Sequence, residues 1–323
     1  MNLKGKSILV TGGAGFIGSH LVDRLIKEDV DKIVVASNFF LGSFENLSEA
    51  KEKFPDLEVV RCDVSDYEEI KELICNNDFD IVFNLAVIPL PTSLVRPEWT
   101  IRKNMEMTLN ICKLLRLGKF KKLIQFSSSE APGSAKVIPM PEDHPTDPET
   151  PYAASKAATD HIAMSYYHTF GCDVTVVRPF NQYGPRQNAK KYAGIIPLMI
   201  GRINRGEDLV IYGDGNQTRD FLYVTDTVDA VVEASKNEKV KGQVLNIASG
   251  KEVSMNNVVK AIADVMNYTK PFVYKDARIG DVKRHIADIK LSRRLLNWEP
   301  KVSFSSGIEK TVEWYLKHPE VFS

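Results

Sequence analysis

The chain has 323 residues, of which 43% are apolar and 26% charged, and these values are typical of a globular protein with one large domain and a smaller lobe. Lysine plus arginine equals aspartate plus glutamate at 42 each, so no net charge draws the protein to nucleic acid or to an anionic membrane. No apolar run reaches the roughly 18 residues of a membrane-spanning helix, and no signal-peptide pattern precedes the first strand, so we expect a cytoplasmic protein.

The four cysteines are widely spaced and include no Cys-x-x-Cys pair. We expect them to be reduced, buried thiols, and we expect neither disulfides nor a metal site. They are Cys62, Cys75, Cys112 and Cys172.

The first predicted strand, Ser7–Val10, leads into a turn with three regularly spaced glycines and then into a helical pattern. Gly12 permits a tight turn, Gly15 lets the backbone approach a pyrophosphate, and Gly18 allows the helix to pack closely on the strand. The phosphates then lie at the helix N-terminus, where free N–H groups and the helix dipole favour anions. This arrangement predicts a dinucleotide-binding turn.

Strands and amphipathic helices alternate from residue 7 to about residue 180. This alternation predicts an α/β fold of the Rossmann type, a doubly wound parallel sheet covered by helices on both faces. The predicted strands are Ser7–Val10, Lys32–Ala36, Leu57–Arg61, Ile81–Leu85, Lys122–Ser127 and Val174–Arg178. We expect a cofactor domain over residues 1–180 and a smaller mixed α/β substrate-binding lobe over 181–323, interleaved with the last sheet strands.

The second strand ends at Ser37, where many NAD-binding proteins carry an acidic residue for the adenosine ribose. No arginine in the following loop pairs with the 2′-phosphate of NADP, so the sequence favours NAD without excluding NADP. Ribose contact then falls to Ser37 or to Asn38. Asp63, after the third strand, is placed to accept from the adenine amino group, and a solvent-facing turn aspartate explains it equally well.

Tyr152 and Lys156 stand four residues apart in a predicted helix, on one face and one turn apart. An ordinary tyrosine is a poor base at neutral pH, but a neighbouring ammonium group and an oxidised nicotinamide both favour the phenolate. The triplet Ser127–Ser129 ends a predicted strand about 25 residues upstream and supplies a hydroxyl that can bridge Tyr152 and a substrate alcohol. An ordinary amphipathic helix accounts for the tyrosine and lysine alone, but not for this combination.

With these motifs the chain resembles the extended short-chain dehydrogenase/reductase family, in particular its nucleotide-sugar epimerases and dehydratases. The resemblance covers nearly the whole chain and implies a catalytic trio of Ser128, Tyr152 and Lys156. The residues it implies at the cofactor, together with those named above, are Gly12, Gly15, Phe16, Ile17, Gly18, Ser37, Asn38, Asp63, Leu85, Ala86, Asn104, Tyr152, Lys156 and Pro179. Those implied at the nucleotide sugar are Ser129, Asn181, Arg186, Tyr212, Arg219, Arg278 and Asp281.

Family members share an oxidation of the sugar C4 hydroxyl and differ in the fate of the resulting 4-keto sugar. Return of the hydride to the other face gives a 4-epimerase, whereas proton abstraction at C5 and loss of the C6 hydroxyl give a 4,6-dehydratase. Glu130 occupies the position of the C5 base in dehydratases, but Ser129 replaces an acid that one dehydratase group uses. The sequence favours a UDP-sugar 4-epimerase slightly over a dehydratase, and ranks lower a UDP-glucuronate decarboxylase and a non-catalytic NAD(P)-binding sensor.

The helices predicted at Pro97–Leu117 and Tyr152–Phe170 carry apolar residues at helical spacing. In family dimers these helices form a four-helix bundle, so the resemblance implies a homodimer. Packing of both stripes on their own sheet explains the pattern equally well.

Overall fold

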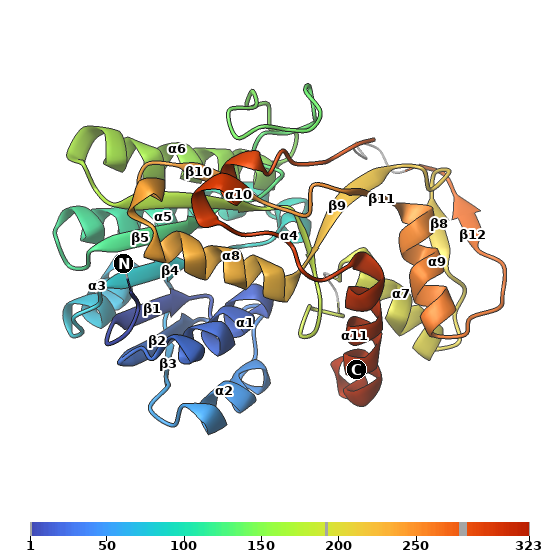
Figure 1. The fold of residues 1–323 in the computed structure, drawn as a ribbon, viewed down its shortest axis with the longest axis horizontal. Coiled ribbons are helices and arrows are strands. Elements are labelled where there is room, and N and C mark those ends of the chain that lie inside the picture. Colours follow the sequence, from blue (N-terminus) through green and yellow to red (C-terminus); the bar gives the residue numbers. More distant parts are fainter. Residues whose placement is uncertain (1, 191–192, 278–282, 323) are drawn as a thin grey trace.

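The computed structural model describes residues 2–190, 193–277 and 283–322, and its main feature is a seven-stranded sheet in which all neighbouring strands run parallel (Figure 1). The strand order is β10-β6-β5-β4-β1-β2-β3, so the winding reverses between β1 and β4. Ligands of such sheets bind at the carboxyl ends of the strands beside this reversal. The strands are β1 (Ser7–Thr11), β2 (Lys32–Ser37), β3 (Glu58–Arg61), β4 (Ile81–Asn84), β5 (Lys122–Phe126), β6 (Val174–Pro179) and β10 (Val244–Ile247).

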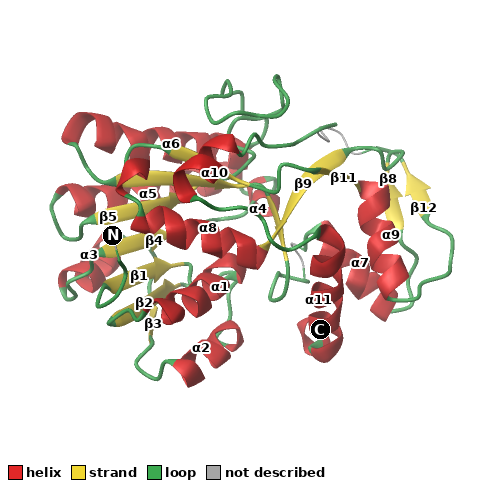
Figure 2. Ribbon diagram, in the orientation of Figure 1, coloured by secondary structure: helices red, strands yellow, loops and turns green. Residues whose placement is uncertain are grey.

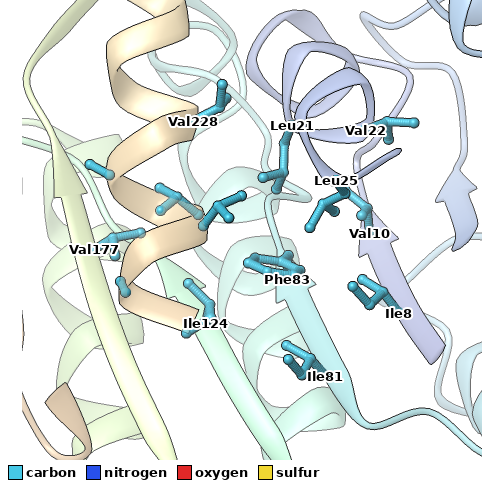
Figure 3. Packing of buried hydrophobic residues seen from close by; sticks show 14 of the residues in the cluster. Ile8, Val10, Leu21, Val22, Leu25, Ile81, Phe83, Ile124, Val177 and Val228 are labelled. Carbon is cyan, nitrogen blue, oxygen red and sulfur yellow. The ribbon is translucent and has the colours of Figure 1, made fainter. Parts of the chain in front are cut away.

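Helices cover both faces of this sheet, because its strands are apolar on both sides (Figure 2). On one face Phe83 of β4 packs among Leu21 and Leu25 of α1 and Val228 of α8 (Figure 3). On the other face Ile74 of α3 and residues of α5 and α6 complete a second core. These helices are α1 (Phe16–Leu25), α2 (Ser48–Lys53), α3 (Tyr67–Cys75), α4 (Leu90–Ser93), α5 (Pro97–Arg116), α6 (Pro151–Phe170), α8 (Val224–Lys236) and α10 (Lys290–Leu296).

A smaller body lies beside the carboxyl ends of the sheet and contains two short sheets and three helices (Figure 1). One sheet holds β9 between β7 and β11, and the other pairs β8 with β12. Tyr183 and Tyr315 are among the largest side chains fully buried in its core. Its elements are β7 (Asn181–Tyr183), α7 (Ile195–Asn204), β8 (Val210–Tyr212), β9 (Thr218–Tyr223), β11 (Glu252–Ser254), α9 (Met255–Val265), β12 (Val273–Lys275) and α11 (Phe304–Lys317).

The predicted fold class is confirmed. Each of the six predicted strands is present, with both ends within one residue of the expected positions, and so are the two long helices, α5 and α6. The seventh strand, β10, pairs with β6, and α8 and α10 cover the same sheet although all three follow residue 181. The chain therefore crosses from the smaller body back to the large sheet twice.

The four cysteines are free thiols. Cys62 and Cys112 are buried, and burial raises the pKa of each to about 12, so these two are poor nucleophiles. The expectation of burial is wrong for Cys75, which is exposed because it points away from the face of α3 that buries Ile70 and Ile74. Cys172 is only partly buried. Within the described ranges, no helix is long and apolar enough to cross a membrane, and no three His, Cys, Asp or Glu side chains gather as metal ligands.

Candidate active site

The glycine-rich turn after β1 is a cradle, Gly12–Gly18, in which the backbone packs too closely to admit side chains at Gly12 and Gly18. Gly12 has a φ of +67°, and a Cβ placed there would lie 3.0 Å from the backbone nitrogen of Ala86. A Cβ on Gly18 would lie 2.4 Å from the carbonyl oxygen of Gly12. Gly15 is the N-cap of α1 and offers no side-chain acceptor to the first N–H groups of that helix. The turn thus fits the diphosphate of a dinucleotide.

One cavity of about 620 Å³ begins at this turn, passes the carboxyl ends of the strands and reaches the smaller body. Arg219 and Phe221 of β9 line its far end. The cavity brings together most of the residues that the sequence assigns to a site, although they come from seven separate segments of the chain. These are Gly12, Gly15, Phe16, Ile17, Gly18, Ser37, Asn38, Leu85, Ala86, Ser128, Ser129, Glu130, Tyr152, Lys156, Pro179, Asn181, Arg186 and Arg219.

Tyr152 and Lys156 project from the first turns of α6 toward the end of β5. The side chains of Tyr152 and Ser128 share a hydrogen bond, and the ammonium group of Lys156 donates to the carbonyl oxygen of Phe126 at 2.6 Å. Helix α6 starts here because the Thr150 side chain accepts from the backbone N–H of Ala153. The expected trio is therefore assembled from two neighbouring elements.

Burial sets the pKa values of this trio. Burial raises the pKa of Tyr152 to about 12, and the hydrogen bond to Ser128 opposes the rise while Glu130 adds to it. Burial also lowers the pKa of Lys156 to about 8, against the attraction of Asp160. In the protein without NAD, desolvation of the phenolate therefore dominates. The lower pKa that the sequence predicts depends on Lys156 and an oxidised nicotinamide together, and it stays a prediction for the cofactor-bound protein.

Sequence reasoning missed a buried ion pair behind the trio. Asp160 lies one turn beyond Lys156 on α6, accepts from the Ser127 hydroxyl at 2.6 Å and pairs with Arg178 of β6 at 3.3 Å. Burial raises the pKa of Asp160, and Arg178 opposes that rise. The spacing of Tyr152, Lys156 and Asp160 at four-residue intervals was the signal that could have revealed it.

The loop after β2 lines part of the cavity, where the sequence predicts the adenosine ribose. The Ser37 hydroxyl accepts from the backbone N–H of Phe39, and the Asn38 side chain accepts from that of Phe40. Asp63 does not line this cavity. One of its oxygens accepts from the N–H and hydroxyl of Ser65, and it faces a neighbouring hollow.

Three further predicted residues, Asn104, Arg186 and Tyr212, also lie elsewhere or have other partners. Asn104 is buried beneath the cavity, where its amide binds both backbone groups of Ile88. Arg186 lines the cavity but pairs with Asp23 of α1 at 2.6 Å. Tyr212 lies in β8 outside the cavity lining. The predicted ligands Arg278 and Asp281 lie outside the described residues.

Asn181 and Arg219 of the smaller body also line the cavity. Asn181 begins β7 directly after the large sheet, and its amide donates to the carbonyl oxygen of Asp220 at 3.5 Å. Arg219 donates to the carbonyl oxygen of Thr218 and lies near His285, whose pKa burial lowers to about 4. The neutral His285 leaves Arg219 as the cationic member of this pair, which suits a phosphate ligand.

Known proteins match almost the whole chain. Residues 9–311 match a family model described as GDP-mannose 4,6 dehydratase. A putative UDP-glucose 4-epimerase of Methanocaldococcus jannaschii is 34% identical over 309 residues, 95% of this chain and 97% of that protein.

Solved structures similar to this chain are also nucleotide-sugar epimerases and dehydratases. A UDP-glucose 4-epimerase of Thermotoga maritima with UDP-glucose has a TM-score of 0.91 and 34% identity, over 97% of this chain and 99% of that one. A dTDP-glucose 4,6-dehydratase of Bacillus anthracis in complex with NAD has a TM-score of 0.87 and 32% identity, over 98% of both chains.

Proposed function

The chain belongs to the nucleotide-sugar epimerases and dehydratases of the extended short-chain dehydrogenase/reductase family, and we propose from this premise that it is an NAD-dependent UDP-hexose 4-epimerase. The observation that carries the proposal is the convergence of the glycine cradle, the Ser128–Tyr152 hydrogen bond and the lobe containing Arg219 on one cavity. Relatives named UDP-glucose 4-epimerase match over almost their whole length.

The roles of the chain's own residues follow from this arrangement. NAD, when bound, supplies the hydride acceptor and a positively charged ring that favours ionisation of Tyr152. Ser128 orients the phenolic oxygen of Tyr152, which takes the proton of the sugar C4 hydroxyl. Lys156, held by the carbonyl of Phe126, provides a positive charge one helical turn away. After rotation of the keto sugar and return of the hydride to the other face of C4, Tyr152 gives its proton back to the C4 oxygen, which completes the epimerisation.

Binding of the two ligands divides between the two bodies. Backbone N–H groups at the start of α1 receive the cofactor diphosphate, since the N-cap Gly15 places no side chain over them. Gly18 lets the helix pack closely against the backbone of Gly12. Ser37 and Asn38 face the adenosine ribose. The diphosphate of the nucleotide sugar lies at Arg219, where a guanidinium group makes charge-assisted hydrogen bonds.

A 4,6-dehydratase is the second candidate, and Glu130 is the observation that favours it. Glu130 lines the cavity and lies close enough to Tyr152 to raise the pKa of the phenol. A carboxylate in this place can remove the C5 proton of a 4-keto sugar. Relatives and solved structures named dTDP-glucose 4,6-dehydratase also match the chain.

NMR of the reaction in D₂O decides between the two. The protein is incubated with UDP-glucose, dTDP-glucose and other nucleotide sugars. An epimerase forms the C4 epimer without solvent deuterium, whereas a dehydratase introduces deuterium at C5 and removes the C6 hydroxyl. Formation of the labelled 6-deoxy product would reject the epimerase proposal.

We also propose a homodimer formed through α5 and α6. The two helices pack against each other, and Leu109 of α5 and Phe170 of α6 remain 39% and 51% exposed. Burial of such side chains favours a bundle with a second copy. Light scattering is expected to give twice the mass of one chain, and a monomer at all concentrations would contradict this.

A further inference from the structure

The turn between β4 and α4 forms an apolar wall of the cavity. All of its members line the cavity, and none of their side chains carries a hydrogen-bond donor or acceptor. Ile88 is buried, and the other four residues keep part of their surface accessible. This apolar wall consists of Val87, Ile88, Pro89, Leu90 and Pro91.

Hydrogen bonds fix the apolar wall beside the catalytic tyrosine. The Asn104 side chain accepts from the Ile88 N–H at 2.8 Å and donates to the Ile88 carbonyl at 3.2 Å. The same amide donates to the Ser155 hydroxyl at 2.9 Å, and that hydroxyl donates to the Tyr152 carbonyl at 2.7 Å. Helix α4 also packs on α5 and α6. These contacts hold the wall against the start of α6, the helix that carries Tyr152 into the same cavity.

The neighbouring turn, after β5, is polar. It supplies Ser128, Ser129 and Glu130 to the same cavity. A hexose with its C4 hydroxyl at Tyr152 thus meets hydrogen-bonding side chains on the β5 side and apolar side chains on the β4 side. A sugar hydroxyl against the apolar wall loses its water partners and gains none, whereas a methyl group gains apolar contact.

We propose that the apolar wall binds a methyl group of the sugar, so that the preferred substrate is a nucleotide hexose with an N-acetyl group or a 6-deoxy carbon. This inference rests on the proposed 4-epimerase function and specifies its substrate class. A matched apolar contact in a pocket is worth about 10- to 200-fold in specificity. The preference for a methyl-bearing sugar over UDP-glucose is expected to fall in that range of kcat/KM.

The test compares UDP-glucose, UDP-N-acetylglucosamine and UDP-6-deoxyglucose as substrates of the NAD-loaded protein. UDP-N-acetylglucosamine carries its methyl group in the N-acetyl group, and UDP-6-deoxyglucose carries it at C6, so comparing these two sugars shows which methyl group the wall prefers. A Val87→Thr/Leu90→Gln variant places polar atoms in the wall at nearly unchanged size. Its matched control makes the same changes just beyond α4, at Leu94 and Val95, which are 67% and 77% exposed and do not line the cavity.

We expect the ratio of kcat/KM for a methyl-bearing sugar to that for UDP-glucose to fall about tenfold in the wall variant. The control is expected to keep the ratio of the unaltered protein. Equal or better turnover of UDP-glucose by the unaltered protein overturns the inference and leaves the epimerase proposal standing. A loss of preference in the control as well also overturns it. If the wall variant unfolds, the single Val87→Thr change replaces it.

Dissociation constants test the wall proposal separately from the epimerase proposal. Calorimetry on the NAD-loaded Tyr152→Phe protein measures the three dissociation constants without conversion of the ligands. If no sugar is turned over by the unaltered protein, the epimerase proposal fails. The wall is then judged by binding alone: tighter binding of a methyl-bearing sugar supports it, and equal binding rejects it.

Discussion

Replacing Lys156 by methionine is expected to abolish turnover without destabilising the fold. A fall in the pKa of Lys156 from 10.5 to about 8 means that the folded protein holds the charged lysine about 3 kcal/mol less favourably than water does. Methionine removes this cost but leaves the Phe126 carbonyl without its donor, which costs about 1–2 kcal/mol. Urea unfolding at pH 7 is therefore expected to show a free energy of unfolding that is unchanged or about 1–2 kcal/mol higher.

The pH dependence separates this reasoning from a simple packing effect. The pKa of Lys156 is lower in the folded state than in the unfolded state, so the penalty is complete below pH 8 and disappears as the pH rises to 10.5. Stability of the unaltered protein therefore gains a contribution from pH 8 upward that the Lys156→Met variant lacks. The advantage of the variant at pH 7 is expected to vanish by about pH 10.

The exposed Lys260 provides the control. It pairs with Asp264 at 2.7 Å with its side chain 65% exposed, and Lys260→Met is expected to change stability by less than about 0.5 kcal/mol at any of these pH values. The reasoning is refuted if Lys156→Met lowers the free energy of unfolding by more than about 2 kcal/mol at pH 7. A difference from the unaltered protein that stays constant with pH refutes it equally.

Three other substitutions test separate parts of the site. Tyr152→Phe is expected to lower kcat by at least about 100-fold while calorimetry finds NAD binding unchanged, and near-normal turnover would disprove its role as the base. Gly18→Ala forces a methyl group to 2.4 Å from the Gly12 carbonyl oxygen, so the affinity for NAD is expected to fall about tenfold or more. The control Gly118→Ala, whose added Cβ has nothing within 4 Å, is expected to leave the affinity for NAD unchanged. Equal affinities of the two variants for NAD would contradict the role of the cradle. Arg186→Met leaves the Asp23 carboxylate unpaired and is expected to cost about 3 kcal/mol in urea unfolding, whereas a loss below about 0.5 kcal/mol would show that the pair contributes little.

Local sequence determined the parts of the site that lie within one element or across one turn. The glycines of the cradle fall within seven residues between β1 and α1, and helical periodicity alone places Tyr152 and Lys156 on one face. The strands were predictable for the same reason, because each is a short apolar run bounded by polar residues. Such features depend on neighbours in the chain, which the sequence shows directly.

Tertiary structure alone decided which distant residues meet. Nothing in the sequence distinguishes Arg186 from Arg219 as a phosphate ligand. In the structure, Arg186 pairs with Asp23, 163 residues earlier, and so links the start of the smaller body to α1. Asn104 supports the turn at Ile88 rather than facing the cavity, and β10 joins β6 from beyond residue 181. The burial that raises the pKa of Tyr152 likewise comes from packing of separate segments, and no spacing along the chain encodes how much water that packing removes.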